Sequence, residues 1–399
     1  MHKLTILTLA LIVSACSDTR PFLRETATVK FGRHDDRPNG NEVITFYALG
    51  DWGTGDQNQK AVANALRKDV AQLPPGREVM PFVLAPGDNV YEVGLPQGWG
   101  EPKVDDLLHQ TFGNIYQGIQ YGGQDIPFHL VAGNHDHAGK AGGKNGVGDV
   151  IHQETTAEKL YPNWRYYPID PAQNADSNDS TDYAALRQKD IFNLTTPEKV
   201  DIGAADNRLA IFALDTQVML ELYQQKNDST LQRHWQELEK LAAASSAKWK
   251  LILGHHPVRS HGTHAGFRSA IWWVPPIIIA TLVDKFFVRR LQDFDHPAYR
   301  AFTRDLSAFM KEHGIVAYVA GHDHSQQFLA IDNRHFQLIA GSAGKLSAAT
   351  HKDDTIFSHS SFGFVRMDLT RNELWMEFFE VVPKTGQVSS SAVFLFREN

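Results

Sequence analysis

The sequence contains one cysteine, Cys16, so no disulfide can form within the chain and a metal site has to use oxygen and nitrogen ligands. It has no run of 18 or more apolar residues and therefore no ordinary membrane-spanning helix. Basic charge is not in excess: 39 Lys and Arg stand against 46 Asp and Glu, a net charge of −7. A nucleic-acid scaffold needs a basic face, so that role is not expected. Hydrophobic residues are 42% of the chain, which is enough for a large core.

Residues 1–15 are typical of an export signal. Lys3 provides positive charge, a short apolar run covers residues 4–13, and two small residues follow. The next residue is Cys16, and the tetrapeptide Val-Ser-Ala-Cys resembles the lipobox of bacterial lipoproteins, whose cysteine is lipidated and becomes the new N-terminus. The other interpretation is an ordinary signal peptide with a buried cysteine. We expect the lipoprotein, because stable anchoring requires more than one acyl chain.

The polar segment 16–41 is expected to be a lipid-anchored tether, although Ala27–Phe31 has the composition of a short edge strand. Ser17, rather than an aspartate, follows the cysteine, which resembles lipoproteins sorted to an outer membrane. These features predict a protein of the cell envelope that faces the periplasm or the cell surface. Residues 42–399 are expected to form a single domain.

One pattern recurs five times along that domain: an apolar run, then a glycine, then a side chain of metal-binding type. The runs are Val43–Leu49, Pro81–Leu84, Ile126–Val131, Leu251–Leu253 and Ile315–Val319. The side chains that follow them are Asp51, Asp88, Asn134, His255 and the pair His322 and His324. Near-continuous apolar runs rich in β-branched and aromatic residues predict strands that are covered on both faces.

Helical patterns lie between these strands, over Gln57–Leu73, Leu231–Ala242 and Pro297–His313. Alternating strands and helices predict an α/β domain. In such sheets, ligands bind beyond the carboxyl ends of the strands, so five strand ends would bring their polar side chains to one place. A single Gly-Asp pair after a strand is usually a turn, but five such ends together predict a shared metal site.

Five motifs carry a resemblance to a known family: Gly50–Gly53 (GDWG), Gly87–Tyr91 (GDNVY), Gly133–His137 (GNHDH), Gly254–Pro257 (GHHP) and Gly321–His324 (GHDH). Their order resembles the five blocks of the calcineurin-like metallophosphoesterases. Trp52 and Tyr91 narrow the resemblance to the purple acid phosphatases, particularly the tartrate-resistant type. It spans residues 42–344 and implies a two-sheet β-sandwich flanked by helices, with a dinuclear metal site at the carboxyl ends of the strands. Three C-terminal runs, Gly363–Met367, Leu374–Val382 and Ala392–Phe396, are expected to be antiparallel strands of this sandwich.

The resemblance also implies which residues hold the metals. The first metal would be held by Asp51, Asp88, Tyr91 and His324. The second would be held by Asp88, which bridges the two ions, together with Asn134, His255 and His322. Two carboxylates and a tyrosinate are hard anionic ligands that favour Fe(III) at the first position, and the imidazole-rich second position suits Fe(II), Zn(II) or Mn(II).

Such a metal pair deprotonates a solvent ligand near or below neutral pH and clamps an in-line displacement at phosphorus. The expected function is therefore an acid phosphomonoesterase that uses a metal-bound hydroxide on small phosphate esters. A phosphodiesterase or nucleotidase on the same centre is the alternative. A non-catalytic envelope protein that kept the metal site is a remote one, because it predicts a lost ligand and every ligand position is filled.

Several histidines outside the ligand set are candidates for proton transfer. The resemblance implies that His135 faces the phosphate. His261 is our choice for the acid that protonates the leaving group. His264 fits the family's spacing better, whereas His261 fits its local sequence better. His256 stands where the family usually has tyrosine, and either a structural or a functional role is open.

Residues 266–295 depart from the family. They include an apolar run of 13 residues with two prolines, too short to span a membrane, followed by charged residues. A lid packed on the domain, interfacial membrane contact through residues 271–291 and contact with a protein partner are the three interpretations. Each would let the segment shape access to the site.

Overall fold

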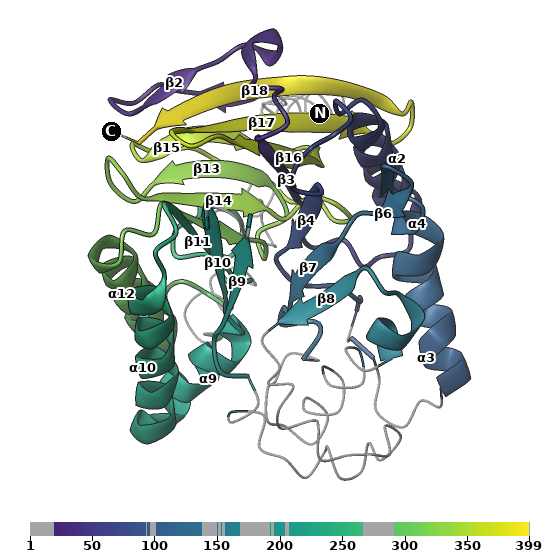
Figure 1. Cartoon of the computed structure of the whole chain (residues 1–399). Coiled ribbons are helices and arrows are strands. Elements are labelled where there is room, and N and C mark those ends of the chain that lie inside the picture. Colours follow the sequence, from purple (N-terminus) through teal and green to yellow (C-terminus); the bar gives the residue numbers. More distant parts are fainter. Residues whose placement is uncertain are drawn as a thin grey trace, which may run out of the picture.

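The computed structural model describes residues 20–92, 94–95, 101–137, 150, 153, 156–167, 192, 195–203, 207–265 and 291–398. Within them, two β-sheets of eight strands each lie face to face, and a separate two-stranded pair is formed by β5 (Gln120–Tyr121) and β6 (Gln124–Asp125). Figure 1 shows the two sheets between two groups of helices, so the chain forms a four-layered sandwich. The predicted fold class is confirmed.

The sheet that we call sheet B has the strand order β2-β18-β17-β16-β3-β4-β7-β8. Its strands are β2 (Val29–Phe31), β3 (Ile44–Ala48), β4 (Phe82–Ala85), β7 (Phe128–Val131), β8 (Trp164–Tyr167), β16 (Phe362–Leu369), β17 (Glu373–Val382) and β18 (Gln387–Arg397). The strands β3, β4, β7 and β8 run parallel, whereas β16, β17 and β18 pair antiparallel, as predicted for the C-terminal runs.

The other sheet, sheet A, has the order β1-β15-β13-β14-β12-β11-β10-β9. Its strands are β1 (Phe22–Leu23), β9 (Glu198–Ile202), β10 (Leu209–Ala213), β11 (Trp249–Leu253), β12 (Ala317–Ala320), β13 (Gln326–Ala330), β14 (Phe336–Ala340) and β15 (Thr355–His359). The strands β10, β11, β12 and β14 run parallel. Each sheet therefore has a block of parallel strands whose carboxyl ends reach the same edge of the sandwich.

Helices cover the outer face of each sheet. Against sheet B lie α2 (Gln57–Ala71), α3 (Glu101–Leu108), a π-helical turn (His109–Gly113) and α4 (Asn114–Tyr116). Against sheet A lie α9 (Thr216–Gln225), α10 (Asp228–Ala244) and α12 (Pro297–Glu312). A short 3-10 turn (His34–Asp36) lies near the N-terminus. The helix α12 begins at Pro297, as predicted, and ends at Glu312, one residue before its predicted end.

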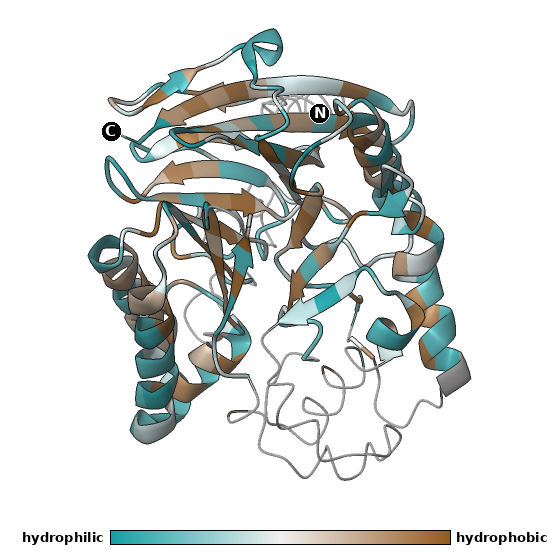
Figure 2. Cartoon of the chain, viewed as in Figure 1, coloured by the Kyte–Doolittle hydropathy of each residue, from teal (hydrophilic) through white to brown (hydrophobic). Residues whose placement is uncertain are grey.

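The apolar core fills three spaces between these layers. The central one lies between the sheets and contains Phe46 and Phe82 of sheet B against Trp249 and Leu338 of sheet A. The outer two lie under the helices. Residues of β3 alternate between the central core and the core under α2, so both faces of the strand are buried. Figure 2 shows the same pattern as brown strands inside and teal residues on the outer sides of the helices.

The N-terminal segment differs from the tether predicted for residues 16–41. Phe22–Leu23 pairs with β15 of sheet A, and Val29–Phe31 pairs with β18 of sheet B. The Phe22 ring also stacks on His351 with 4.0 Å between ring centroids. The expected edge strand at residues 27–31 is thus confirmed over its last three residues. The tether has to end before Phe22, because the chain beyond it belongs to the sandwich.

Some predictions lie outside the described residues: the export signal, Cys16, and residues 266–290 of the apolar insertion. Among the helices that the structure describes, none is both long and apolar enough to cross a membrane.

Candidate metal centre

The predicted ligands come from two different sheets. The oxygen donors follow strands of sheet B and comprise Asp51 after β3, Asp88 and Tyr91 after β4, and Asn134 after β7. The imidazoles follow strands of sheet A and comprise His255 after β11 and His322 and His324 after β12. All seven strand-end side chains approach one another where the parallel blocks of the two sheets meet.

Three of the ligand positions have left-handed backbone. The φ angles are 54° at Asp51, 54° at Asp88 and 71° at His322, a region that residues other than glycine adopt at a cost of about 1 kcal/mol or more. Neighbouring glycines make room for the carboxylates. A Cβ atom on Gly133 would lie 2.2 Å from Asp88 Oδ1, and one on Gly321 would lie 2.3 Å from Asp51 Oδ2. The recurring glycines are therefore needed where carboxylates approach the backbone.

Tyr91 joins the first group of donors. Its hydroxyl donates to Asp88 Oδ2 at 2.7 Å and lies 3.2 Å from Asp51 Oδ1 and 3.4 Å from His324 Nε2. Burial and the two carboxylates raise the pKa of Tyr91 well above its usual value. A cation among these four groups would reverse that effect, since it favours the tyrosinate.

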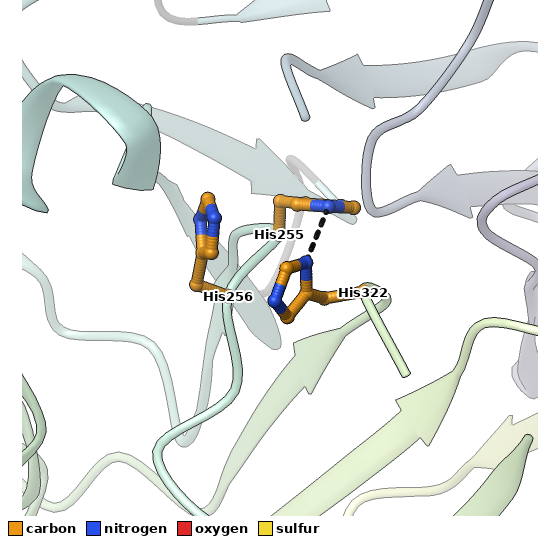
Figure 3. Close-up of side chains that lie close together, drawn as sticks. All are labelled: His255, His256 and His322. Atoms are coloured by element: carbon orange, nitrogen blue, oxygen red, sulfur yellow. Dashed lines mark hydrogen bonds between the residues drawn. The ribbon is translucent and has the colours of Figure 1, made fainter. Parts of the chain in front are cut away.

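The second group consists of Asn134, His255 and His322. Asn134 Oδ1 lies 2.9 Å from His255 Nε2 and 3.1 Å from His322 Nδ1, and the two ring nitrogens are 3.3 Å apart (Figure 3). The outer nitrogens face carbonyls: His255 Nδ1 donates to Pro86 O at 2.8 Å and His322 Nε2 to Gln292 O at 3.2 Å. Those bonds fix the tautomers of the two imidazoles. Lone pairs of Asn134 Oδ1, His255 Nε2 and His322 Nδ1 therefore point at one another.

This donor set fits two cations. Three acceptors at mutual distances of about 3 Å repel one another unless a proton or a metal ion lies among them. Asp88 connects the groups, since its Oδ2 accepts from Tyr91 and its Oδ1 lies 3.5 Å from His255 Nε2. Asp51, Asp88 and His255 each offer a ligand atom within 4.8 Å of the others, and all three are buried. Asp88 therefore has the position that a bridging ligand needs.

Asp136 positions two of the ligand loops. Its buried carboxylate accepts from the backbone N–H groups of Asn89, Val90 and Gly133 at 2.8–3.1 Å. Burial, reinforced by the charge of Asp88, raises the pKa of Asp136 to about 6. The loops after β4 and β7 are thus held together by one side chain, which orients backbone.

A buried histidine–aspartate pair connects the two sheets beside the site. His137, on the loop after β7 of sheet B, lies 2.7 Å through Nε2 from Asp215 Oδ2, at the end of β10 of sheet A. Burial opposes protonation of the imidazole, but Asp215 outweighs it and raises the pKa of His137. Asp215 also caps α9 by accepting from the Val218 N–H at 3.0 Å. Asp215 thus orders the start of α9, and its contact with His137 joins the two sheets.

His135 lies beside the first group. Its backbone N–H donates to Asp88 Oδ1 at 3.0 Å, and its ring contacts the backbone carbonyl of Glu92 through Nδ1. The centroid of the ring is 4.5 Å from that of Tyr91. The ring is partly exposed, as a residue that meets a phosphate has to be.

His261 and His264 take different places on one turn. His261 Nε2 lies 2.6 Å from Asp354 Oδ1, so its ring is directed to a surface carboxylate. The His264 ring instead stacks on the predicted ligand His322, with 3.9 Å between centroids, and Asp293 is 3.5 Å away. Burial opposes protonation of His264, but Asp293 and its other acidic neighbours raise the pKa. Of these two histidines, His264 is therefore the one that contacts a predicted metal ligand.

His256 is buried between the ligand group and α9. Its Nδ1 lies 2.8 Å from Thr216 Oγ1, which also accepts the backbone N–H groups of His255 and His256. A hydroxyl that accepts twice has its own proton left to donate, so Nδ1 is the acceptor and Nε2 carries hydrogen. The ring centroid is 4.5 Å from that of His322 (Figure 3). Burial lowers the pKa of His256 well below its usual value.

A pocket of about 450 Å³ with both polar and apolar lining residues opens beside the first group. It is lined by His324 and by residues that the sequence patterns did not single out, among them Asp56, Glu92, Lys345 and Phe362. Lys345 follows β14 and a Gly-containing turn. The strand, glycine and polar residue pattern that identified the ligands could have identified it too.

Comparison with known proteins agrees with this geometry. Residues 44–326 match the family model of the calcineurin-like phosphoesterases, and the chain belongs to that family. The chain is 26% identical over 377 residues to purple acid phosphatase 4 of Arabidopsis thaliana, covering 90% of this chain and 84% of the relative. It is 23% identical over 319 residues to tartrate-resistant acid phosphatase type 5 of Rattus norvegicus, covering 75% of this chain and 72% of the relative.

A solved structure shares the fold. The purple acid phosphatase PPD1 of yellow lupin (Lupinus luteus) superposes with a TM-score of 0.54 at 15% identity, covering 90% of this chain and 55% of that one. The two curated relatives confirm the predicted resemblance to purple acid phosphatases, and the solved structure shows the shared fold. The family and the clustered donors define an acid phosphatase-like hydrolase of phosphate esters that uses two metal ions.

Proposed function

We propose that the protein is an acid phosphomonoesterase in which Asp51, Asp88, Tyr91 and His324 hold one metal ion and Asp88, Asn134, His255 and His322 hold the other. The observation that carries the proposal is the convergence of both groups on Asp88, which lies 2.7 Å from the Tyr91 hydroxyl and 3.5 Å from His255 Nε2. A shared carboxylate holds two cations close enough to act on one phosphate group.

The donor chemistry supports Fe(III) at the first position. Asp51, Asp88 and an ionised Tyr91 bring three negative charges, and hard anionic oxygens favour a trivalent ion. The second position has two imidazoles and an amide beside the shared carboxylate, which suits Fe(II), Zn(II) or Mn(II). Five positive charges against three negative ones leave a centre that attracts a phosphate dianion.

Two bound metal ions would supply Lewis acidity and positive charge for in-line hydrolysis. The protein's own residues orient the substrate and move protons. His135, whose backbone N–H donates to Asp88 and whose ring is partly exposed, would hydrogen-bond a phosphate oxygen. His264, held by Asp293 and stacked on His322, is the better placed of the two candidate acids to protonate a leaving oxygen. His261, the acid predicted from the sequence, is paired with Asp354.

The test is a metal analysis combined with a panel of phosphate esters, on the protein that starts at Cys16. We expect two metal ions per chain, one of them iron, and faster hydrolysis of monoesters than of diesters at acidic pH. Faster hydrolysis of diesters or nucleotides would favour the phosphodiesterase or nucleotidase alternative. Full metal occupancy without hydrolysis of any ester would favour the non-catalytic alternative.

We also propose that the protein is lipidated at Cys16 and faces the periplasm or the cell surface from an outer membrane. The export signal and the lipobox support this location, and residues 271–291 are a candidate for additional membrane contact. Cys16→Ser is expected to release an active protein from the membrane fraction. A variant that stays membrane-bound would show that another segment is the dominant anchor.

A further inference from the structure

Lys345 lies over the face of the Tyr91 ring. Its ammonium nitrogen is 3.7 Å from the ring centroid, well inside the range of a cation–π contact. The same nitrogen donates to Glu92 Oε1 at 2.8 Å. The side chain of Lys345 is 24% exposed and that of Glu92 is 71% exposed, so the contact is at the edge of the site. A cation is thus held on the ring of a predicted metal ligand.

The backbone of this lysine is fixed to the loop that carries Asp51. The N–H of Gly344 donates to Asp51 O at 3.1 Å, and the N–H of Ala343 donates to Gly50 O at 3.2 Å. A Cβ atom on Gly344 would lie 2.7 Å from Trp52 O, so the two loops are in close contact. Lys345 is therefore not a freely placed surface lysine.

The ring of Tyr91 is contacted from another direction by the imidazole of His135, at 4.5 Å between centroids and an interplanar angle of 60°. The aromatic ring carries negative charge on its face, and ionisation of its oxygen adds to it. The energy of an electron on that ring is lowered by a nearby cation, and the effect is large where water is partly excluded. The ammonium group of Lys345 is such a cation, and the carboxylate of Glu92 offsets part of its charge.

We infer that Lys345 is a positioning residue that tunes the Tyr91–metal bond, making the tyrosinate a weaker electron donor, and that Glu92 attenuates this effect. The inference rests on the proposed function, because it requires Tyr91 to bind Fe(III). A weaker donor leaves the iron a stronger Lewis acid with a higher reduction potential. It also places the tyrosinate-to-iron charge-transfer band at higher energy.

The test uses the iron-loaded enzyme and reads its visible absorption and its reduction midpoint. Lys345→Met keeps the length of the side chain and removes the charge. It should shift the band to longer wavelength, on the order of 10 nm, and lower the midpoint. Glu92→Gln should shift both in the opposite direction, because the charge of Lys345 is then no longer offset. Lys345→Arg should retain the wild-type band, since it keeps the cation.

A packing defect would not produce opposite shifts from two variants that break the same ion pair. The matched control is Lys311→Met on α12, whose side chain is 49% exposed and whose ammonium lies 3.6 Å from Asp332. It should leave the band unchanged. Unshifted bands in both Lys345→Met and Glu92→Gln would overturn the inference. If the wild-type protein is coloured, the proposed function would still stand in that case. A colourless wild-type protein with full iron occupancy would overturn the inference together with the assignment of Tyr91.

Discussion

The two sheets contribute different chemistry to the centre. Sheet B supplies the oxygen donors, from Asp51 to Asn134, whereas sheet A supplies the imidazoles of His255, His322 and His324. Neither sheet alone completes a site, because sheet B supplies three of the four donors of the first group and two of the four of the second. The hard ligands and the softer ones therefore meet only when both halves of the sandwich have packed, and metal binding is coupled to that packing.

Asp88 is the residue whose loss should break both halves. Asp88→Ala removes the only predicted ligand that belongs to both groups. We expect both metals to be lost and activity to fall to background, because each remaining group keeps only three donors. Metal analysis of the purified variant checks this, and circular dichroism verifies that it is folded. A variant that keeps both metals would contradict the bridging role.

On the imidazole side, His264 and His261 can be separated by leaving group. His264→Ala should keep both metals and lower turnover of an ester with a poor leaving group about 10²-fold, the usual scale for general acid catalysis. An activated ester, whose leaving group needs no proton, should be affected much less.

His261→Ala is the matched comparison, since it lies on the same turn but pairs with Asp354. We expect little difference between the two esters for this variant. If His261→Ala shows the larger contrast, His261 is the acid. Equal losses on both esters for His264→Ala would exclude it from proton donation.

Among the oxygen donors, Tyr91→Phe should remove the colour of the iron-loaded protein. Its loss of activity should be smaller than that of Asp88→Ala. The phenyl ring preserves the packing against His135 but cannot form the tyrosinate that produces the visible band. Absorption spectra at matched iron content provide the measurement. A variant with an undiminished band would show that another residue is the source of the colour.

Within sheet B but away from the centre, His129 should affect stability alone. Burial, reinforced by Arg165, lowers its pKa to about 4. Between pH 6.5 and 4 the unfolded chain then binds a proton that the folded chain does not, so stability falls as the pH falls, by up to about 3 kcal/mol. His129→Leu should reduce this acid destabilisation in urea unfolding at pH 4.5 while leaving metal content unchanged. If the pH dependence of unfolding stability is unaltered in this variant, the lowered pKa of His129 is contradicted.

Much of the centre could be predicted from local patterns. The strand ends at Asp51, Asp88, Asn134, His255 and His322 follow apolar runs, and five of the predicted strands match β3, β4, β7, β11 and β12 within a few residues. Such runs are local, since burial on both faces demands continuous apolar residues. The helices α2, α10 and α12 were predictable because apolar residues recur at helical spacing on one face of each, and α12 begins with a proline.

What could not be predicted depends on contacts between distant parts of the chain. The helix α9 was not predicted, and its first turn is capped by Asp215, which lies at the end of β10 and also contacts His137 of the other sheet. The separation of His261 from His264 depends on Asp354 and Asp293, far from both in the sequence. The strand and glycine pattern after β14 can mark Lys345, but its contact with the Tyr91 ring depends on backbone bonds from Ala343 and Gly344 to Gly50 and Asp51, which the pattern does not reveal.

The pairing of Phe22 with β15 limits how far the catalytic domain can move from a lipid. If Cys16 carries the proposed acyl chains, only about six residues separate the bilayer from the first paired residue, a reach of at most ~20 Å. The enzyme would then sample a thin layer of solution next to the membrane rather than the whole compartment. Esters released or displayed at that surface would meet it at a high effective concentration.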